Sequence, residues 1–236
     1  MKWRSLEEPS SVGDARSLRD QFAERRALIA RYVPEETQAI HARVVAELNQ
    51  QEITRGALAP GAAAPAFQLN DHLENPISSV ELLTKGRLII CFFRGRWCPF
   101  CVGQLEAMNQ ILPQIAKAGA SLVAISPQTI QQSFFMADQH KLQFPLLSDA
   151  GNRVAGQFSL VYSVPDYQKA IYRKVFINLP FVNGEESWEL PIPATYILNH
   201  HSTVLYASVN PDYTERPEPA DILAELLRSS DQHGSV

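Results

Sequence analysis

The sequence predicts an α/β fold in which a central mixed sheet is flanked by helices and preceded by a helical extension at the N-terminus. Two patterns predict it. Apolar strand-like runs alternate with helical segments through the larger, C-terminal part of the chain, and amphipathic helical spacing dominates the segment before it. The 236 residues are 45% hydrophobic and 19% charged, which is typical of a globular protein with a sizeable core.

The N-terminal segment, residues 14–54, is predicted to form two helices. Apolar residues recur near one helical face from Leu18 to Val33, and Pro34 with two following acidic residues is typical of a new helix start. Two interpretations are open. The helices either form a hairpin through which the chain makes a homodimer, or they pack against the main domain, which we favour.

Residues 56–71 are rich in glycine, alanine and proline, which is typical of a linker that leads into a new domain. We therefore expect an N-terminal helical extension over residues 1–58 and the main domain over residues 59–236.

The main domain is expected to begin its sheet with "RLIICFF", a continuous apolar run typical of a strand buried on both faces. The expected strands are 87–93, 121–126, 144–149 and a hairpin of 194–199 with 203–209. The expected helices are 99 to about 118, kinked or broken at Pro113, then 128–141 and 219–229. Residues 165–191 read as an insertion, a helix followed by an irregular loop.

The overall charge and hydropathy exclude several classes of protein. A net charge of −4 argues against a nucleic-acid binder, which usually carries a basic excess. The first residues lack the apolar core of a secretory signal, and no run of about 18 apolar residues would span a membrane. We expect a cytoplasmic protein that binds neither membrane nor nucleic acid.

The stretch "FFRGRWCPFC" places Cys98 and Cys101 three positions apart, directly after the first buried strand. A structural zinc site needs about four ligands, and no second cysteine or histidine pair has the required spacing. A bridge across so short a loop would restrict little of the unfolded chain. Redox chemistry is the interpretation that remains, so we expect no metal and no other cofactor.

The position of Cys98 favours a reactive thiolate. It is expected at the N-terminus of a helix, where Pro99 suits the first turn and the helix dipole stabilises an anion. Arg94 and Arg96 add positive charge nearby, and Trp97 is expected to wall the site. Cys101 would then resolve a mixed disulfide. The third cysteine, Cys91, lies in the apolar run and reads as a core residue.

These residues resemble the thioredoxin-fold superfamily. "WCPFC" is similar to the W-C-G-P-C of thioredoxins, and its C-P-F-C to the C-P-Y-C of glutaredoxins. "PIPATYILN" resembles the P-T-x-F-L-I-D entry to the second half of that sheet. The resemblance implies a thioredoxin-like fold and makes Pro193 the cis-proline beside the cysteines. The backbone of Ile192 would then be exposed to pair with a substrate chain.

Between about residues 60 and 225 the chain most resembles peroxiredoxins of the alkyl hydroperoxide reductase/thiol-specific antioxidant group. "AFQLND", "LVAISPQ" and "FPLLSDAGNRVAGQFSLVY" look like successive landmarks of that group, and "NPDYTERPEP" resembles its C-x-x-C subgroup. The site departs from the group's P-x-x-x-T-x-x-C pattern. Cys101 takes the position of the attacking cysteine, Arg94 replaces the proline and Cys98 the threonine.

The group's usual arginine falls at Pro193, so another arginine, among Arg94, Arg96 and Arg153, would have to replace it. The two resemblances also disagree on which cysteine attacks first. The thioredoxin pattern makes Cys98 the first nucleophile and the peroxiredoxin alignment makes it Cys101. The position of Cys98 at the helix end favours Cys98.

The leading hypothesis is therefore an antioxidant thiol oxidoreductase that cycles Cys98 and Cys101 between dithiol and disulfide. It would reduce peroxides with electrons from thioredoxin or other cellular thiols. The alternatives are a general reductase of protein disulfides and a redox sensor that does not turn over.

Overall fold

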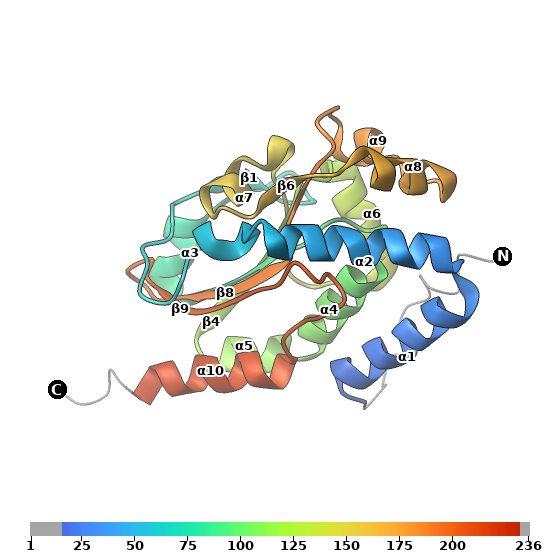
Figure 1. The fold of residues 1–236 in the computed structure, drawn as a ribbon. Coiled ribbons are helices and arrows are strands. Elements are labelled where there is room, and N and C mark those ends of the chain that lie inside the picture. The colour runs from blue at the N-terminus through green and yellow to red at the C-terminus, as the bar shows by residue number, and fades with distance from the viewer. Residues whose placement is uncertain (1–15, 232–236) are drawn as a thin grey trace.

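A five-stranded mixed sheet forms the centre of the protein, and helices cover both of its faces (Figure 1). The computed structural model describes residues 16–231. The strand order is β5-β4-β3-β8-β9, in which β3, β4 and β5 run parallel and β8 and β9 run antiparallel to their neighbours. The strands are β3 (Arg87–Phe92), β4 (Ala120–Ser126), β5 (Leu146–Ser148), β8 (Ala194–Leu198) and β9 (Val204–Val209). The predicted α/β class and its five main strands are confirmed.

Two short two-stranded sheets lie outside the central sheet. They pair β1 (Gln68–Asn70) with β2 (Pro76–Ser78), and β6 (Val161–Ser163) with β7 (Glu189–Pro191), both antiparallel. The helices of the main domain are α3 (Ser79–Lys85), α4 (Pro99–Gln110), α5 (Leu112–Lys117), α6 (Ile130–His140), α7 (Arg153–Gln157), α8 (Asp166–Lys174), α9 (Leu179–Asn183) and α10 (Pro219–Asp231). Two 3-10 turns, η2 (Ile53–Gly56) and η3 (Ala150–Asn152), complete the structure.

The break predicted at Pro113 is present. Helix α4 ends at Gln110, and α5 begins at Leu112 with Pro113 in its first turn. Proline fits there because the first turn of a helix leaves its N–H groups without intrahelical acceptors.

Strand β3 shows how the sequence builds a core on both faces of the sheet. Its residues alternate between two hydrophobic clusters, with Ile90 in one and Ile89 in the other. The Ile89 face is covered by α4, α5, α6 and α10, and the Ile90 face by α3, α7 and α8. A strand buried on both faces must be apolar throughout, which explains the uninterrupted run in the sequence.

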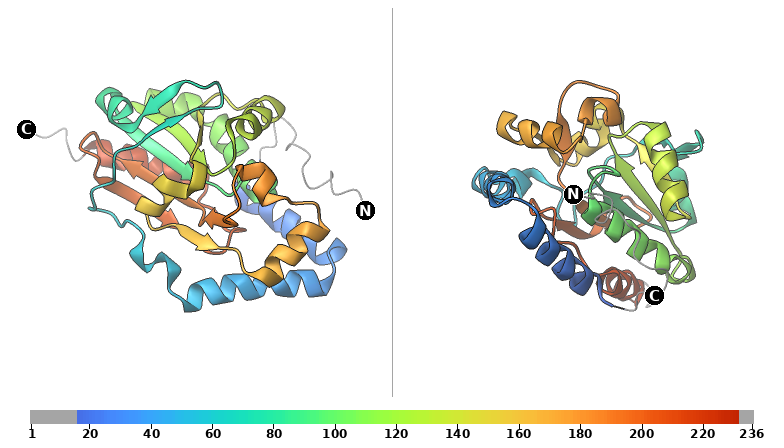
Figure 2. Two further views of the ribbon diagram at one scale, coloured as in Figure 1. Left: turned by 90° about the horizontal axis from the view of Figure 1, so that it is seen from above. Right: turned by 90° about the vertical axis from the view of Figure 1, so that its right-hand side faces the viewer.

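The N-terminal residues form α1 (Leu18–Tyr32) and α2 (Glu35–Gln50), which diverge from the turn between them and lie against different parts of the main domain, α1 against α4 and α2 against α8 (Figures 1 and 2). Phe22 of α1 is buried in the cluster beneath α4, and Val44 and Leu48 of α2 are buried in the cluster on the opposite face. The favoured interpretation, packing against the main domain, agrees with this burial. The homodimer stays a prediction.

The insertion at residues 165–191 is more ordered than the sequence predicts. It contains α8, α9 and strand β7, and the short connections on either side of α9 are irregular. Helix α8 packs against α2, so the insertion and the N-terminal helices meet. Within residues 16–231, none of the helices is long and apolar enough to cross a membrane.

Candidate active site

The turn between β3 and α4 places Cys98 at the N-terminal end of α4, as predicted. Cys98 is the N-cap residue and Pro99 occupies the first helical position. Gly95 makes the turn possible. Its φ of 143° favours glycine, and a Cβ atom there would lie 2.6 Å from the Trp97 indole nitrogen.

All three cysteines are free thiols with buried side chains. Cys98 is 1% exposed and Cys101 0%, so solvent exposure does not distinguish the two sulfurs. The two differ in another way. Cys98 lines a cavity of about 470 Å³, whereas Cys101 lies behind it and is not part of the lining.

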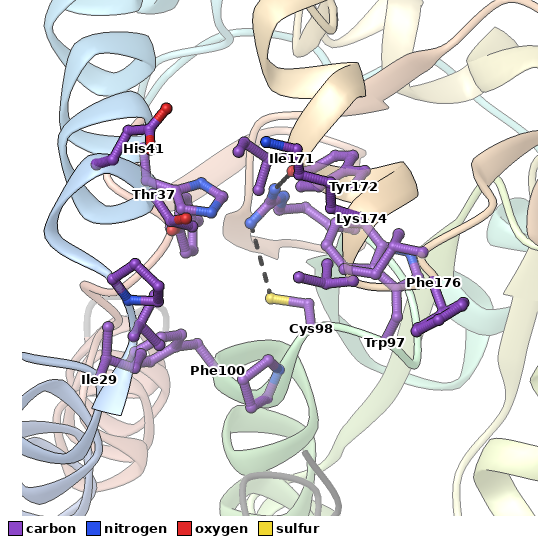
Figure 3. A pocket seen from close by; sticks show the side chains of 18 residues that line it. Ile29, Thr37, His41, Trp97, Cys98, Phe100, Ile171, Tyr172, Lys174 and Phe176 are labelled. Carbon is purple, nitrogen blue, oxygen red and sulfur yellow. Dashed lines mark hydrogen bonds between the residues drawn. The ribbon is translucent and has the colours of Figure 1, made fainter. Parts of the chain in front are cut away.

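This space, the Cys98 cavity, lies between the N-terminal helices and α8 (Figure 3). Figure 3 shows Ile29, Thr37 and His41 on one side of the Cys98 sulfur, with Tyr172 and Phe176 on the other. The apolar part of the lining consists of Ile29, Val33, Pro34, Trp97, Pro99, Phe100, Ile171, Val175, Phe176 and Ile177. A small polar set lies among these residues, namely Thr37, His41, Arg94, Tyr172 and Tyr213, with Glu36 and Lys174 as further charged residues.

Arg94 lies at the sulfur. Its Nη1 is 3.8 Å from Cys98 Sγ, and another nitrogen of the guanidinium donates to the hydroxyl of Tyr172. The side chain is 2% exposed and is sandwiched by aromatic rings, 4.7 Å from the Trp97 centroid and 4.1 Å from that of Tyr213. A buried guanidinium held in this way presents a fixed positive charge to the thiol.

The electrostatics make Cys98 the thiolate of the pair. Burial opposes its ionisation, but hydrogen bonding to the Cys101 thiol and the charges of Arg94 and Arg216 outweigh burial and lower the pKa of Cys98 to about 5. Burial, followed by the hydrogen bond and negative charge of Cys98, raises the pKa of Cys101 well above its usual range. At neutral pH the site therefore holds one thiolate, on Cys98, and one thiol, on Cys101.

Arg216, which no local sequence pattern identifies as a site residue, lies beside the second sulfur. Its Nη2 is 3.6 Å from Cys101 Sγ, while its Nε donates to Gln104 Oε1 at 2.8 Å. Gln104 in turn donates to Thr195 Oγ1 at 3.0 Å, and both of these residues are buried. "NPDYTERPEP" contains Arg216 and Tyr213, but the loop pattern gave no sign that the chain returns to the cysteines.

Cys91 behaves as the core residue that the apolar run predicts. It is fully buried, and burial raises the pKa of its thiol to about 12. Its sulfur lies 3.9 Å from Thr195 Oγ1. A thiol that stays protonated at neutral pH is a poor nucleophile.

The remaining arginines and Trp97 have distinct positions. Trp97 walls the Cys98 cavity as expected. The side chain of Arg96 donates to Gln132 Oε1 at 3.1 Å and lines a neighbouring cavity of about 390 Å³ instead. Arg153 begins α7 and is exposed, so it takes no part in the lining. The arginine beside the Cys98 sulfur is Arg94.

The predicted cis bond at Ile192–Pro193 is wrong, since the bond is trans. The chain enters β8 directly after β7, and the Ile192 N–H donates to the carbonyl of Leu160 at 2.6 Å. Ile192 is also buried. Its amide is therefore used within the fold, and the predicted pairing of a substrate chain with this backbone loses its structural basis.

His41 was not predicted as a site residue because it lies outside the recognisable motif. Burial and the charge of Arg94 lower the pKa of His41 to about 4, so the ring is neutral at physiological pH. Its ring packs near those of Tyr172 and Tyr213, with centroids 6.2 Å and 5.9 Å away. Within residues 16–231, no three His, Cys, Asp or Glu side chains gather as a metal site would require.

The sequence is similar to several known proteins. The AhpC/TSA family matches residues 60–207. The chain is 32% identical to chloroplastic peroxiredoxin Q of Sedum lineare over 101 residues, which is 42% of this chain and 53% of that protein. It is 29% identical to chloroplastic peroxiredoxin Q of Oryza sativa subsp. japonica over 181 residues, 76% of this chain and 70% of that protein.

The fold is also similar to a solved structure, that of peroxidoxin BcpB from Mycobacterium tuberculosis. The TM-score is 0.57 at 21% identity, and the superposition covers 73% of this chain and 97% of the other. The match to the Sedum lineare protein spans only about half the length of that relative.

Proposed function

The chain belongs to the AhpC/TSA family and is a thiol-dependent oxidoreductase, and from this premise we propose that it reduces peroxides by cycling Cys98 and Cys101 between dithiol and disulfide. One observation carries the proposal. The sulfur with the lowered pKa, Cys98, is also the sulfur that lines a cavity beside a buried guanidinium.

In the first step the Cys98 thiolate attacks one oxygen of the peroxide ROOH. The O–O bond breaks, Cys98 becomes a sulfenic acid, and the leaving RO⁻ takes a proton from solvent. Arg94 lies where it can stabilise both the thiolate before attack and the negative charge that develops on the peroxide oxygens.

In the second step Cys101 loses its proton and its sulfur attacks that of the Cys98 sulfenic acid. A disulfide forms and water leaves. Arg216 supports this step, because its guanidinium lies 3.6 Å from the Cys101 sulfur and offsets the unfavourable ionisation of a buried thiol. Two thiols of a reductant, which we propose to be thioredoxin-like, then restore the dithiol and become a disulfide themselves.

The general disulfide reductase is disfavoured by the same geometry. The Cys98 sulfur lies within the cavity rather than on an open surface, and the Ile192 amide that would pair with a substrate chain already has an acceptor. A small peroxide meets neither obstacle.

Steady-state peroxide reduction, coupled to thioredoxin, thioredoxin reductase and NADPH, tests the proposal. We expect turnover in the natural sequence and in Cys91→Ala, and none in Cys98→Ser. Cys101→Ser should react once and keep a sulfenic acid on Cys98, detected by mass spectrometry after dimedone labelling. A sulfenic acid formed rapidly on Cys101 of Cys98→Ser would reverse the order. Reduction of a protein disulfide without peroxide turnover would instead support the reductase alternative.

A further inference from the structure

The walls of the Cys98 cavity come from two different parts of the chain. Ile29, Val33, Thr37 and His41 belong to α1, α2 and the turn between them, all of which lie before the family match at residues 60–207. The sulfur belongs to the matched region. The helical extension is therefore part of the site and not only a support for the domain.

The extension is fixed in this position from both sides. On the α1 side, Phe22 packs edge-to-face on Phe100 with ring centroids 5.1 Å apart, and Arg25 donates to the carbonyl of Pro99. The carboxylate of Glu218 accepts from the backbone N–H of Leu18 at 3.0 Å, which holds the start of α1.

On the α2 side, Tyr167 of α8 donates to the Glu47 carboxylate, and Arg43 lies 4.2 Å from the Tyr167 ring centroid. Together these contacts hold the α1–α2 side of the cavity in place facing the α8 side.

The chemistry of the lining changes along the cavity. Arg94 lies at the sulfur and donates to the hydroxyl of Tyr172, and His41 lies on the facing side, whereas Ile29, Val33 and Phe176 present only hydrocarbon (Figure 3). Hydrogen peroxide would use the polar groups alone. A hydroperoxide with a bulky apolar group would in addition bury that group against the hydrocarbon, which stabilises it in proportion to the area removed from water.

We propose that the α1–α2 pair is the specificity-determining element of the site, and that it selects hydroperoxides carrying a bulky apolar group. This inference rests on the proposed function, since it assigns a substrate class to the same sulfur. The O–OH end would lie against Cys98 and Arg94, and the apolar group against Ile29, Val33 and the α8 side of the cavity.

The first test compares Ile29→Trp with Leu28→Trp. Both replace an aliphatic residue of α1 by tryptophan, but Leu28 is 37% exposed and lies outside the lining. The measured quantity is the ratio of kcat/KM for cumene hydroperoxide to that for hydrogen peroxide. We expect Ile29→Trp to lower this ratio roughly tenfold, the effect of losing the burial of about two methylene groups. Leu28→Trp should keep the natural ratio. An unchanged ratio in Ile29→Trp overturns the proposal.

The second test does not depend on turnover. The probe is 2-phenylpropan-2-ol, the alcohol that cumene hydroperoxide becomes, and its binding to the reduced protein is measured by isothermal titration calorimetry. We expect Val33→Ala to weaken binding by roughly threefold to tenfold, with Leu28→Ala as the matched control. Equal affinity in all three proteins overturns the proposal. Binding that depends on Val33 in a protein without peroxide turnover refutes the proposed function and supports the apolar site.

Discussion

The guanidinium of Arg216 lies 3.6 Å from the sulfur of Cys101 although the two residues are 115 positions apart in the sequence. Arg94 has the corresponding place at Cys98, at 3.8 Å. The arginine nearest to the sulfur therefore differs between the two cysteines, one following β3 and the other following β9, although both charges favour the Cys98 thiolate. We expect Arg216 to matter most for the second step, because it is the arginine beside Cys101.

Replacing Arg216 by glutamine should slow the second step. Without the positive charge, the Cys101 thiolate becomes harder to form, so the Cys98 sulfenic acid should persist after one equivalent of peroxide. We expect its lifetime to increase roughly tenfold, the effect of about 1.4 kcal/mol. Dimedone trapping at timed intervals measures it. Arg216→Lys keeps the charge and should recover part of the rate, whereas disulfide formation as fast as in the natural protein would exclude this role.

The reactivity of Cys98 should depend on pH in a defined direction. Because its pKa is lowered to about 5, the thiolate is already formed at neutral pH, and alkylation by iodoacetamide should fall only as pH decreases through about 5. Arg94→Gln removes a charge that favours the thiolate, so the fall should begin at higher pH. Mass spectrometry of the Cys98 peptide reports the rates. An alkylation profile with its midpoint near 9 in the natural protein would contradict a lowered pKa.

The disulfide should join Cys98 to Cys101 and leave Cys91 reduced. Cys91 is fully buried with a raised pKa, whereas the other two sulfurs lie beside arginines. Peptide mapping of the protein after mild peroxide treatment and alkylation distinguishes the three pairings. Recovery of Cys91 in a bridge would show that β3 opens during oxidation.

Truncating Phe22 should release α1 from the domain. The side chain is 3% exposed and contacts Phe100, so Phe22→Ala should lower the free energy of unfolding by about 3 kcal/mol. Leu28→Ala, on the exposed side of the same helix, should change it by less than about 0.5 kcal/mol. Urea denaturation followed by circular dichroism measures both. Equal effects would indicate that α1 is not held through its buried face.

Much of the fold could be predicted because the sequence signals were local. The apolar run of β3 and the Cys98–Pro99 helix start each depend on neighbouring residues, and both were found. The prediction about Pro193 failed in a non-local way: the bond is trans, and the Ile192 amide donates to Leu160, a residue that the local motif does not include.

The full site could not be predicted for a different reason. Arg216 and His41 come to the cysteines through the tertiary fold, one from the loop after β9 and the other from α2. Neither residue carries a local signal of its role. Amphipathic spacing shows which face of α2 is covered but not what covers it, and a loop such as the one that holds Arg216 has no periodic pattern at all.

One wall of the Cys98 cavity comes from the segment before residues 60–207, whereas both sulfurs come from within that region. This separation affects how related proteins can diverge. Substitutions in α1 or α2 at wall positions such as Ile29 change apolar area without removing the charges next to Cys98 and Cys101. Substrate range can therefore drift while the redox chemistry is conserved. Two proteins that share the match over residues 60–207 need not share a substrate, and exchanging the segment before it offers a direct route to re-engineering the enzyme.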